Sequence, residues 1–287
     1  MSSVNKPIRI GRIDFTNVWP LFYYFPYERL QQEVELITQV PTQLNAAMAA
    51  GEIDIGPISS FAYGEYFEEY MLLPDMSVSA YGDVKSILLF HRKPLSELGG
   101  SPVALPTTSA SSVNLLKIIL QRFYQVEPNY HYAAPVLGEM MKSADAALLI
   151  GDHAIRESWE DHGYMVTDLA QEWTKWTGQW MSFAVCAIRK QVVLEKPELV
   201  SRIYRAFMES KRKSLHDLTA LVQEARQLIG GTDSYWRQYF STLTYEFGPE
   251  QQAGLQLYYR YAWELGFLNK QVQIQLWNDN LLTQVTE

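Results

Sequence analysis

The sequence has only one cysteine, Cys186, among its 287 residues. A single cysteine excludes an internal disulfide and any metal site built from several cysteines. Cys186 lies in the apolar run 183–188, so we expect a small buried side chain rather than a nucleophile.

Long apolar stretches are absent as well. No run approaches the ~18 residues that a membrane-spanning helix needs. Residues 1–7 are polar and contain no apolar core of the kind that secretion signals carry. We therefore expect a cytoplasmic protein with no membrane partner.

Basic residues are in the minority, with 24 Lys and Arg against 32 Asp and Glu and a formal net charge of −8. A nucleic-acid-binding surface needs a basic patch, so nucleic acid is not an expected partner. A bound anion would have to be held by local hydrogen-bond donors, because the overall field of the protein repels it.

Standard catalytic and metal-binding patterns are also missing. The five histidines show no zinc-ligand spacing, and we find no Gly-x-Ser-x-Gly elbow, phosphate-binding glycine loop or dinucleotide fingerprint. We expect no bound metal. Asp152 and His153 are adjacent at an expected helix start, so we interpret Asp152 as a cap and His153 as a partly exposed side chain.

Short apolar strands alternate with helical stretches along the first half of the chain. Strand-like segments occur at residues 8–13, 34–37, 53–56, 86–90, 103–106 and 146–150, and helical spacing dominates from about residue 195. This alternation predicts α/β units with mainly parallel sheets flanked by helices, followed by a helical C-terminal region.

A chain of 287 residues is long enough for two such units. We expect the chain to cross between them near residues 91–94 and to return near residues 180–183. Lobe one would then contain residues 1–91 and 184–287, lobe two residues 92–183, and a ligand cleft would lie between them.

Ligands of open α/β sheets bind beyond the carboxyl ends of the strands, where loops lead into helices. Asn17 follows the first strand, where a turn-forming role is an equal alternative. Ser86 begins a buried strand and needs either a backbone or a ligand partner. The other candidates for substrate binding at strand ends are Ser59, Ser60, Thr108, Ser109, Ser111, Ser112, Gly151 and Asp152.

Hydroxyl side chains are densest at residues 107–112, where five of six residues are Ser or Thr. Free N–H groups at a helix start, together with hydroxyls, bind a carboxylate or phosphate without a positive side chain. The alternative is that these residues only cap a structural helix, but one cap needs a single hydroxyl. The residues thus indicate an anion-binding cleft without defining a reaction.

Several segments occur in an order and spacing that resemble a known family. They are residues 10–17 (IGRIDFTN), 51–59 (GEIDIGPIS), 84–87 (VKSI), 107–109 (TTS) and 144–152 (ADAALLIGD). Together with Asp168-Leu169 and the tryptophan-rich stretch up to Phe183, they resemble the chorismate dehydratases of the futalosine route to menaquinone. The resemblance covers residues 8–268.

The resemblance implies the two-lobed type 2 periplasmic-binding-protein fold, a cytoplasmic location and no metal or organic cofactor. It implies a lyase that eliminates water from chorismate to give 3-[(1-carboxyvinyl)oxy]benzoate. Asn17 and Ser86 are then the expected catalytic residues. The substrate's own enolpyruvyl carboxylate is the expected base, and a monomer or homodimer is the expected assembly.

Three other functions remain as alternatives. A solute-binding protein for a small carboxylate uses the same fold, but we expect it to carry an export signal and an anchoring cysteine. The related 1,4-dihydroxy-6-naphthoate synthase is expected to carry a Pro-Cys-Pro-Asn-type segment where this chain has residues 14–17 (DFTN). A ligand-sensing domain would be expected to have an attached DNA-binding module.

Overall fold

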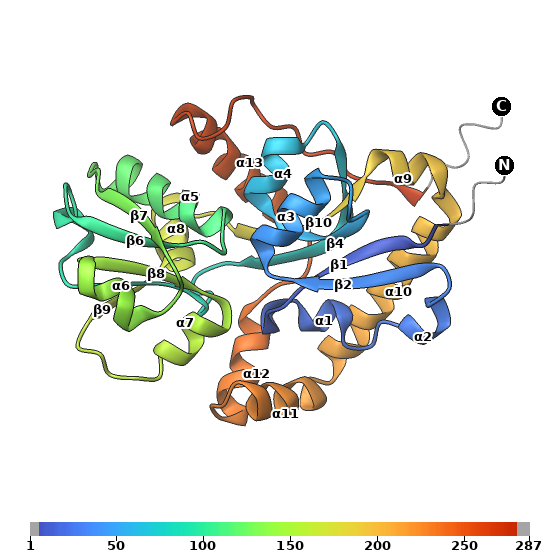
Figure 1. Ribbon diagram of the computed structural model, residues 1–287, viewed down its shortest axis with the longest axis horizontal. Coiled ribbons are helices and arrows are strands. Elements are labelled where there is room, and N and C mark those ends of the chain that lie inside the picture. The colour runs from blue at the N-terminus through green and yellow to red at the C-terminus, as the bar shows by residue number, and fades with distance from the viewer. Residues whose placement is uncertain (1–5, 280–287) are drawn as a thin grey trace.

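Two five-stranded sheets form the centre of the structure, a computed structural model that describes residues 6–279 (Figure 1). In spatial order, the first sheet contains β2 (Val34–Gln39), β1 (Ile8–Ile13), β3 (Ile55–Ser59), β10 (Met181–Arg189) and β4 (Tyr70–Ala80). The second contains β7 (Asn129–Ala133), β6 (Pro102–Pro106), β8 (Ala146–Ile150), β5 (Ile87–His91) and β9 (Met165–Asp168). We call each sheet with its helices lobe one and lobe two.

Helices cover both sheets, and lobe one carries most of them (Figure 1). Lobe one includes α1 (Trp19–Phe22), α2 (Tyr27–Leu30), α3 (Pro41–Ala49), α4 (Ser60–Tyr66), α9 (Lys190–Glu195), α10 (Pro197–His216), α11 (Thr219–Leu228), α12 (Asp233–Thr242) and α13 (Pro249–Glu264). Lobe two includes α5 (Ser111–Ile118), α6 (Leu137–Ser143), α7 (Gly151–Glu157) and α8 (Leu169–Thr177). Within residues 6–279, no helix is long and apolar enough to cross a membrane.

The expectation of two mainly parallel sheets is confirmed. In each sheet one strand runs against the other four, namely β10 in lobe one and β5 in lobe two. Each of these reversed strands is the first to follow a crossing between the lobes. The reversal follows from topology, because a strand that enters a sheet directly from the other lobe has no helical crossover to turn it parallel.

The position of the first crossing differs from the expectation. β4 ends at Ala80 in lobe one, and β5 begins at Ile87 in lobe two, so the chain crosses at residues 81–86 and not near residues 91–94. The expected boundary of lobe one at residue 91 is therefore wrong, because it includes β5, which belongs to lobe two. An apolar strand such as β5 can be buried in either sheet, and its sequence does not show which strands it pairs with.

Cys186 lies on β10 and is 1% exposed, as its apolar neighbours predict. Burial raises the pKa of its thiol, which keeps it protonated and unreactive. Helix α13 packs closely over the start of the same strand. A Cβ atom at Gly254 would lie 2.1 Å from the carbonyl oxygen of Trp180, so only glycine permits this approach to the crossing chain.

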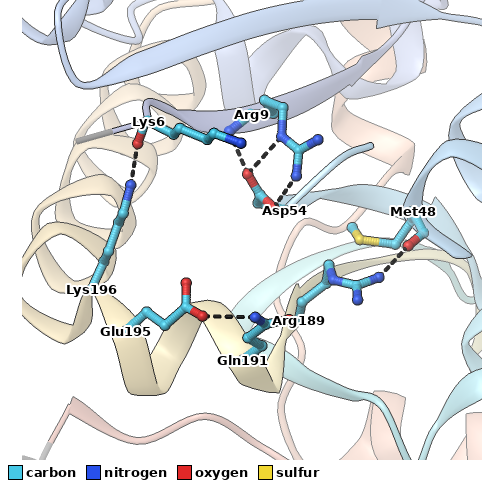
Figure 2. A network of polar contacts seen from close by, with 8 residues as sticks. All are labelled: Lys6, Arg9, Met48, Asp54, Arg189, Gln191, Glu195 and Lys196. Atoms are coloured by element: carbon cyan, nitrogen blue, oxygen red, sulfur yellow. Dashed lines mark hydrogen bonds and ion pairs between the residues drawn. The ribbon is translucent and has the colours of Figure 1, made fainter. Parts of the chain in front are cut away.

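A polar network surrounds the beginnings of β1 and β3 in lobe one (Figure 2). The Arg9 guanidinium donates to both carboxylate oxygens of Asp54 at 3.0 and 2.7 Å, and the Arg9 backbone N–H donates at 2.9 Å. Such a bidentate pair holds its two strands in register. Because Arg9 is near the start of β1, the opposite end of that strand leads to Asn17.

Asp168 fastens the first crossing segment to lobe two. One of its carboxylate oxygens accepts the backbone N–H groups of Val84 and Lys85 at 2.9 and 2.7 Å. The other accepts those of Ala170 and Gln171 at 2.9 and 3.3 Å, which caps α8. Lys85 has a φ of +60°, a strained conformation for a residue with a side chain. The Asp168 carboxylate therefore holds the turn that leads into Ser86.

Asp168→Asn should lower the free energy of unfolding by roughly 2 to 4 kcal/mol. Asparagine caps helices as well as aspartate does, so α8 keeps its cap. However, the NH2 group that replaces one carboxylate oxygen can only donate, so with the remaining oxygen at the cap, the N–H groups of Val84 and Lys85 lose their partner. Chemical denaturation measures the change.

Asp161→Asn is the matched control, because the exposed Asp161 carboxylate accepts a single hydrogen bond from the described residues, from the Gly163 backbone N–H at 3.0 Å. It should change stability by less than about 0.5 kcal/mol. Equal losses in the two variants would contradict the anchoring role of Asp168.

Candidate functional site

The carboxyl ends of four parallel strands bring most of the predicted site residues to one junction. β1 and β3 are neighbours in lobe one, and β6 and β8 are neighbours in lobe two. The loops after each pair therefore lie at a single sheet edge. Two hydrogen bonds join these edges across the lobes, and we take this interlobe junction as the candidate site.

The first of the two bonds connects the loop after β1 with the start of α7. The Thr16 hydroxyl donates to the Asp152 carboxylate at 2.5 Å, and the Thr16 backbone N–H lies 3.4 Å from both of its oxygens. Burial raises the pKa of Asp152, and the hydrogen bonds from Thr16 oppose this rise. Asp152 is therefore not the helix cap that we expected, since α7 begins without a side-chain cap.

The second bond connects the beginnings of α4 and α5. The backbone N–H of Phe61 donates to the Ser111 hydroxyl at 3.0 Å. Two tyrosines of α13 support this contact from behind: Tyr258 donates to the Ser111 carbonyl at 3.2 Å, and Tyr259 donates to the Ser60 carbonyl at 2.7 Å. The C-terminal helix thereby fixes the positions of both helix starts.

Two predicted site residues carry buried oxygens that lack a partner. Among residues 6–279, nothing forms a hydrogen bond with Asn17 Oδ1 or with Thr108 Oγ1. Asn17 follows β1 in lobe one, and Thr108 follows β6 in lobe two, so the two residues belong to opposite lobes. A buried polar atom without a partner costs about 1–3 kcal/mol, which a polar ligand would recover.

Three of the other hydroxyls, those of Ser59, Ser60 and Ser109, have partners within the protein. Ser59 caps α4 by accepting the N–H of Ala62 at 3.1 Å, and it also accepts the Asn45 amide at 3.1 Å. The Ser60 hydroxyl donates to the carbonyl of Ser182 on β10 at 2.7 Å. In the hydroxyl-rich loop, Ser109 Oγ accepts the backbone N–H of Ser112 at 3.3 Å.

Ser86 and Gly151 lie side by side at the lobe-two edge of the junction. The Gly151 N–H donates to the Ser86 carbonyl at 2.7 Å, and Ser86 itself is 1% exposed. Gly151 has a φ of +58°, and a Cβ atom there would lie 2.9 Å from the Phe15 ring of lobe one. Glycine is therefore required both by the backbone conformation and by the contact between the lobes.

Sequence reasoning missed two groups at this junction. Thr16 is adjacent to Asn17, but nothing in the sequence marks it as the partner of Asp152. Tyr239 of α12 is fully buried, and the nearby Ser86 and Thr16 side chains lower the pKa of its hydroxyl, although the hydroxyl forms no hydrogen bond of normal geometry with any described residue. With 18 tyrosines in the chain, the sequence has no signal that singles out this one.

His153 follows Asp152 and is half-buried, with its ring edge-on to Phe15 at 6.3 Å between centroids. The part of the chain that the structure describes contains no group of three or more His, Cys, Asp or Glu side chains placed to hold a metal ion.

Comparison with solved structures shows the fold. A protein from Archaeoglobus fulgidus matches with a TM-score of 0.73 at 19% identity, covering 91% of this chain and 98% of that one. The periplasmic aliphatic sulphonate-binding protein of Escherichia coli matches with a TM-score of 0.67 at 15% identity, covering 96% and 93%. The two-lobed architecture is thus that of periplasmic binding proteins.

Comparison with known sequences shows the family. The chorismate dehydratase of Thermus thermophilus is 29% identical over 268 residues, which cover 88% of this chain and 94% of that protein. A family model described as menaquinone biosynthesis matches residues 8–264. The chain therefore belongs to the menaquinone biosynthesis family.

Proposed function

We propose that this protein is a chorismate dehydratase, which eliminates water from chorismate to give 3-[(1-carboxyvinyl)oxy]benzoate in the futalosine route to menaquinone. The observation that carries the proposal is the similarity to the Thermus thermophilus enzyme, which spans nearly the full length of both chains. The proposal includes a cytoplasmic location and a reaction that needs no metal or organic cofactor.

The interlobe junction suits a small molecule with oxygens at both ends. Chorismate has two carboxylates and a ring hydroxyl. The loop before α5 offers the Thr108 hydroxyl, which has no hydrogen-bond partner within residues 6–279, and the first N–H groups of the helix, which favour a carboxylate. Asn17 and Ser86 lie at the lobe-one and lobe-two edges, and we assign them as the polar contacts to the reacting part of the ring.

The elimination removes the proton from the ring carbon that bears the ether, and the neighbouring carbon loses its hydroxyl. The electrons of the broken C–H bond form the new ring double bond, and the proton leaves with the hydroxyl as water. Because the product ring is aromatic, the substrate itself provides much of the driving force. The site has to hold one ring conformer and stabilise the departing oxygen.

We assign the role of base to the enolpyruvyl carboxylate of the substrate. The side chains described at the junction support this assignment. Asp152 is engaged by Thr16, and His153 is placed against Phe15. A carboxylate tethered to the reacting carbon also has a high effective concentration, so a protein base is not required.

The first test is to incubate the chelator-treated protein with chorismate and to identify the products by chromatography and mass spectrometry. We expect loss of one water and accumulation of the carboxyvinyloxy-benzoate. Chorismate that stays intact beside an active control enzyme would contradict the proposal. Activity that appears only after metal is added back would contradict its metal independence.

Thr108→Val should lower kcat/KM roughly tenfold, because it removes a hydroxyl that we assign to the substrate. Its stability should not fall, since that hydroxyl has no hydrogen-bond partner among the described residues. Steady-state kinetics and thermal denaturation measure the two effects.

Ser59→Ala is the control with the opposite pattern. It removes the cap of α4 and should cost about 1 kcal/mol of stability, with kcat/KM within about twofold of the unaltered protein. A variant of Thr108 that unfolds more easily but reacts normally would argue against its role in substrate binding.

His153→Ala should leave kcat within about threefold, whereas loss of a general base typically costs 10²–10⁴-fold. The physical reason is that the substrate carboxylate, not the imidazole, takes the proton. Single-turnover kinetics on the folded variant measure the rate of the chemical step. A fall of a hundredfold or more, with an unchanged circular dichroism spectrum, would assign the base to His153.

A further inference from the structure

Tyr239 lies on α12, which is part of the helical extension that follows α10. Its ring is 0% exposed and is fixed on several sides. It stacks with Tyr235 at 6.3 Å and 7° between planes, and it meets Trp236 edge-on at 5.5 Å. A ring held in this way has a defined direction for its hydroxyl.

The hydroxyl of Tyr239 is directed at the candidate site. The side chains of Ser86 and Thr16 lie close enough for hydrogen-bond-type contacts that lower its pKa, whereas the charge of the Asp152 carboxylate raises it. Within residues 6–279, however, it forms no hydrogen bond of normal geometry. Buried tyrosine hydroxyls normally find a partner, so an unpaired one beside two polar side chains indicates a place for a ligand atom.

The position of α12 depends on lobe two. Trp159, just after α7, packs its ring edge-on against Tyr235 at 5.1 Å and covers the turn at Gly231 between α11 and α12. Figure 1 shows this turn region beneath α7, where the extension of lobe one reaches the other lobe. Tyr239 is therefore held at the junction by contacts from both lobes.

We propose that Tyr239 is a catalytic residue of this protein, whose hydroxyl donates a hydrogen bond to the departing ring hydroxyl of the substrate beside Ser86. This inference rests on the proposed dehydratase function and adds a residue from the C-terminal helices to the site. Thr16, Ser86 and Asp152 come from three other segments, so the proposal adds a fourth segment, α12, to the site.

The Tyr239 hydroxyl donates a hydrogen bond but keeps its proton during the reaction. Burial raises the pKa of its hydroxyl well above the ordinary value, the Ser86 and Thr16 hydroxyls oppose this rise, and the charge of the Asp152 carboxylate adds to it. The phenol stays neutral during the reaction. The proton that completes the water molecule is the one that the substrate carboxylate takes from the ring carbon, so no proton is gained from or lost to the protein.

Tyr239→Phe is the test, because it removes one oxygen and keeps the ring. We expect kcat to fall roughly ten- to a hundredfold with little change in KM, since the hydrogen bond strengthens as charge develops on the departing oxygen. We expect the melting temperature to stay equal or to rise, because the buried hydroxyl forms no hydrogen bond of normal geometry with the described part of the chain.

Tyr63→Phe is the matched control. The Tyr63 ring is also 0% exposed, but its hydroxyl donates to the Gln273 carbonyl at 3.2 Å and accepts the Gln275 N–H at 2.9 Å. This variant should melt at a lower temperature and keep its kcat. The pair thus separates a contact with substrate from a contact within the fold.

The outcomes distinguish the inference from the proposed function. If the unaltered protein leaves chorismate intact, the proposed function fails. If the unaltered protein is active and Tyr239→Phe keeps its kcat, only the inference fails. A lower melting temperature of Tyr239→Phe also overturns the inference, whatever the activity, because it shows that the hydroxyl already has a partner within the fold.

Discussion

The contact between Thr16 and Asp152 is the interaction on which the arrangement of the site depends. A buried carboxylate is costly unless hydrogen bonds compensate its charge, and here the partner belongs to the other lobe. The two sheet edges therefore have to meet at this point. Asn17 of lobe one and Thr108 of lobe two each carry a buried oxygen without a hydrogen-bond partner among residues 6–279, and Phe15 covers Gly151.

The crossings between the lobes limit how the two edges can be oriented. β4 and β10 pair up to the points where the chain leaves lobe one and where it returns, with Ala80 opposite Met181. On the lobe-two side, Asp168 holds the backbone of Val84 and Lys85, which sets the direction in which the chain enters Ser86. The same carboxylate that caps a helix thus fixes a candidate site residue through the backbone, without touching the junction itself.

Much of the candidate site could be predicted because strand ends are visible in a sequence. The loops after β1, β3, β6 and β8 were identifiable from apolar segments that end in Ser, Thr, Asn or Gly, and these loops do meet. The role of each hydroxyl was not identifiable. Ser59 and Thr108 look equivalent in the sequence, yet Ser59 caps a helix and the Thr108 hydroxyl has no partner among the described residues. The difference between the two roles depends on the local direction of the backbone, which the residue types do not show.

The sequence by itself determined the alternation of strands and helices, the burial of Cys186, the hydroxyl-rich loop and the resemblance to a family, because these properties are local or are matched segment by segment. The tertiary structure alone decided that β5 belongs to lobe two, that Asp152 pairs with Thr16, and that Tyr239 reaches the junction. Thr16 and Asp152 are separated by 136 residues, and contacts at such separations depend on how whole lobes pack. No local pattern in the chain encodes that packing.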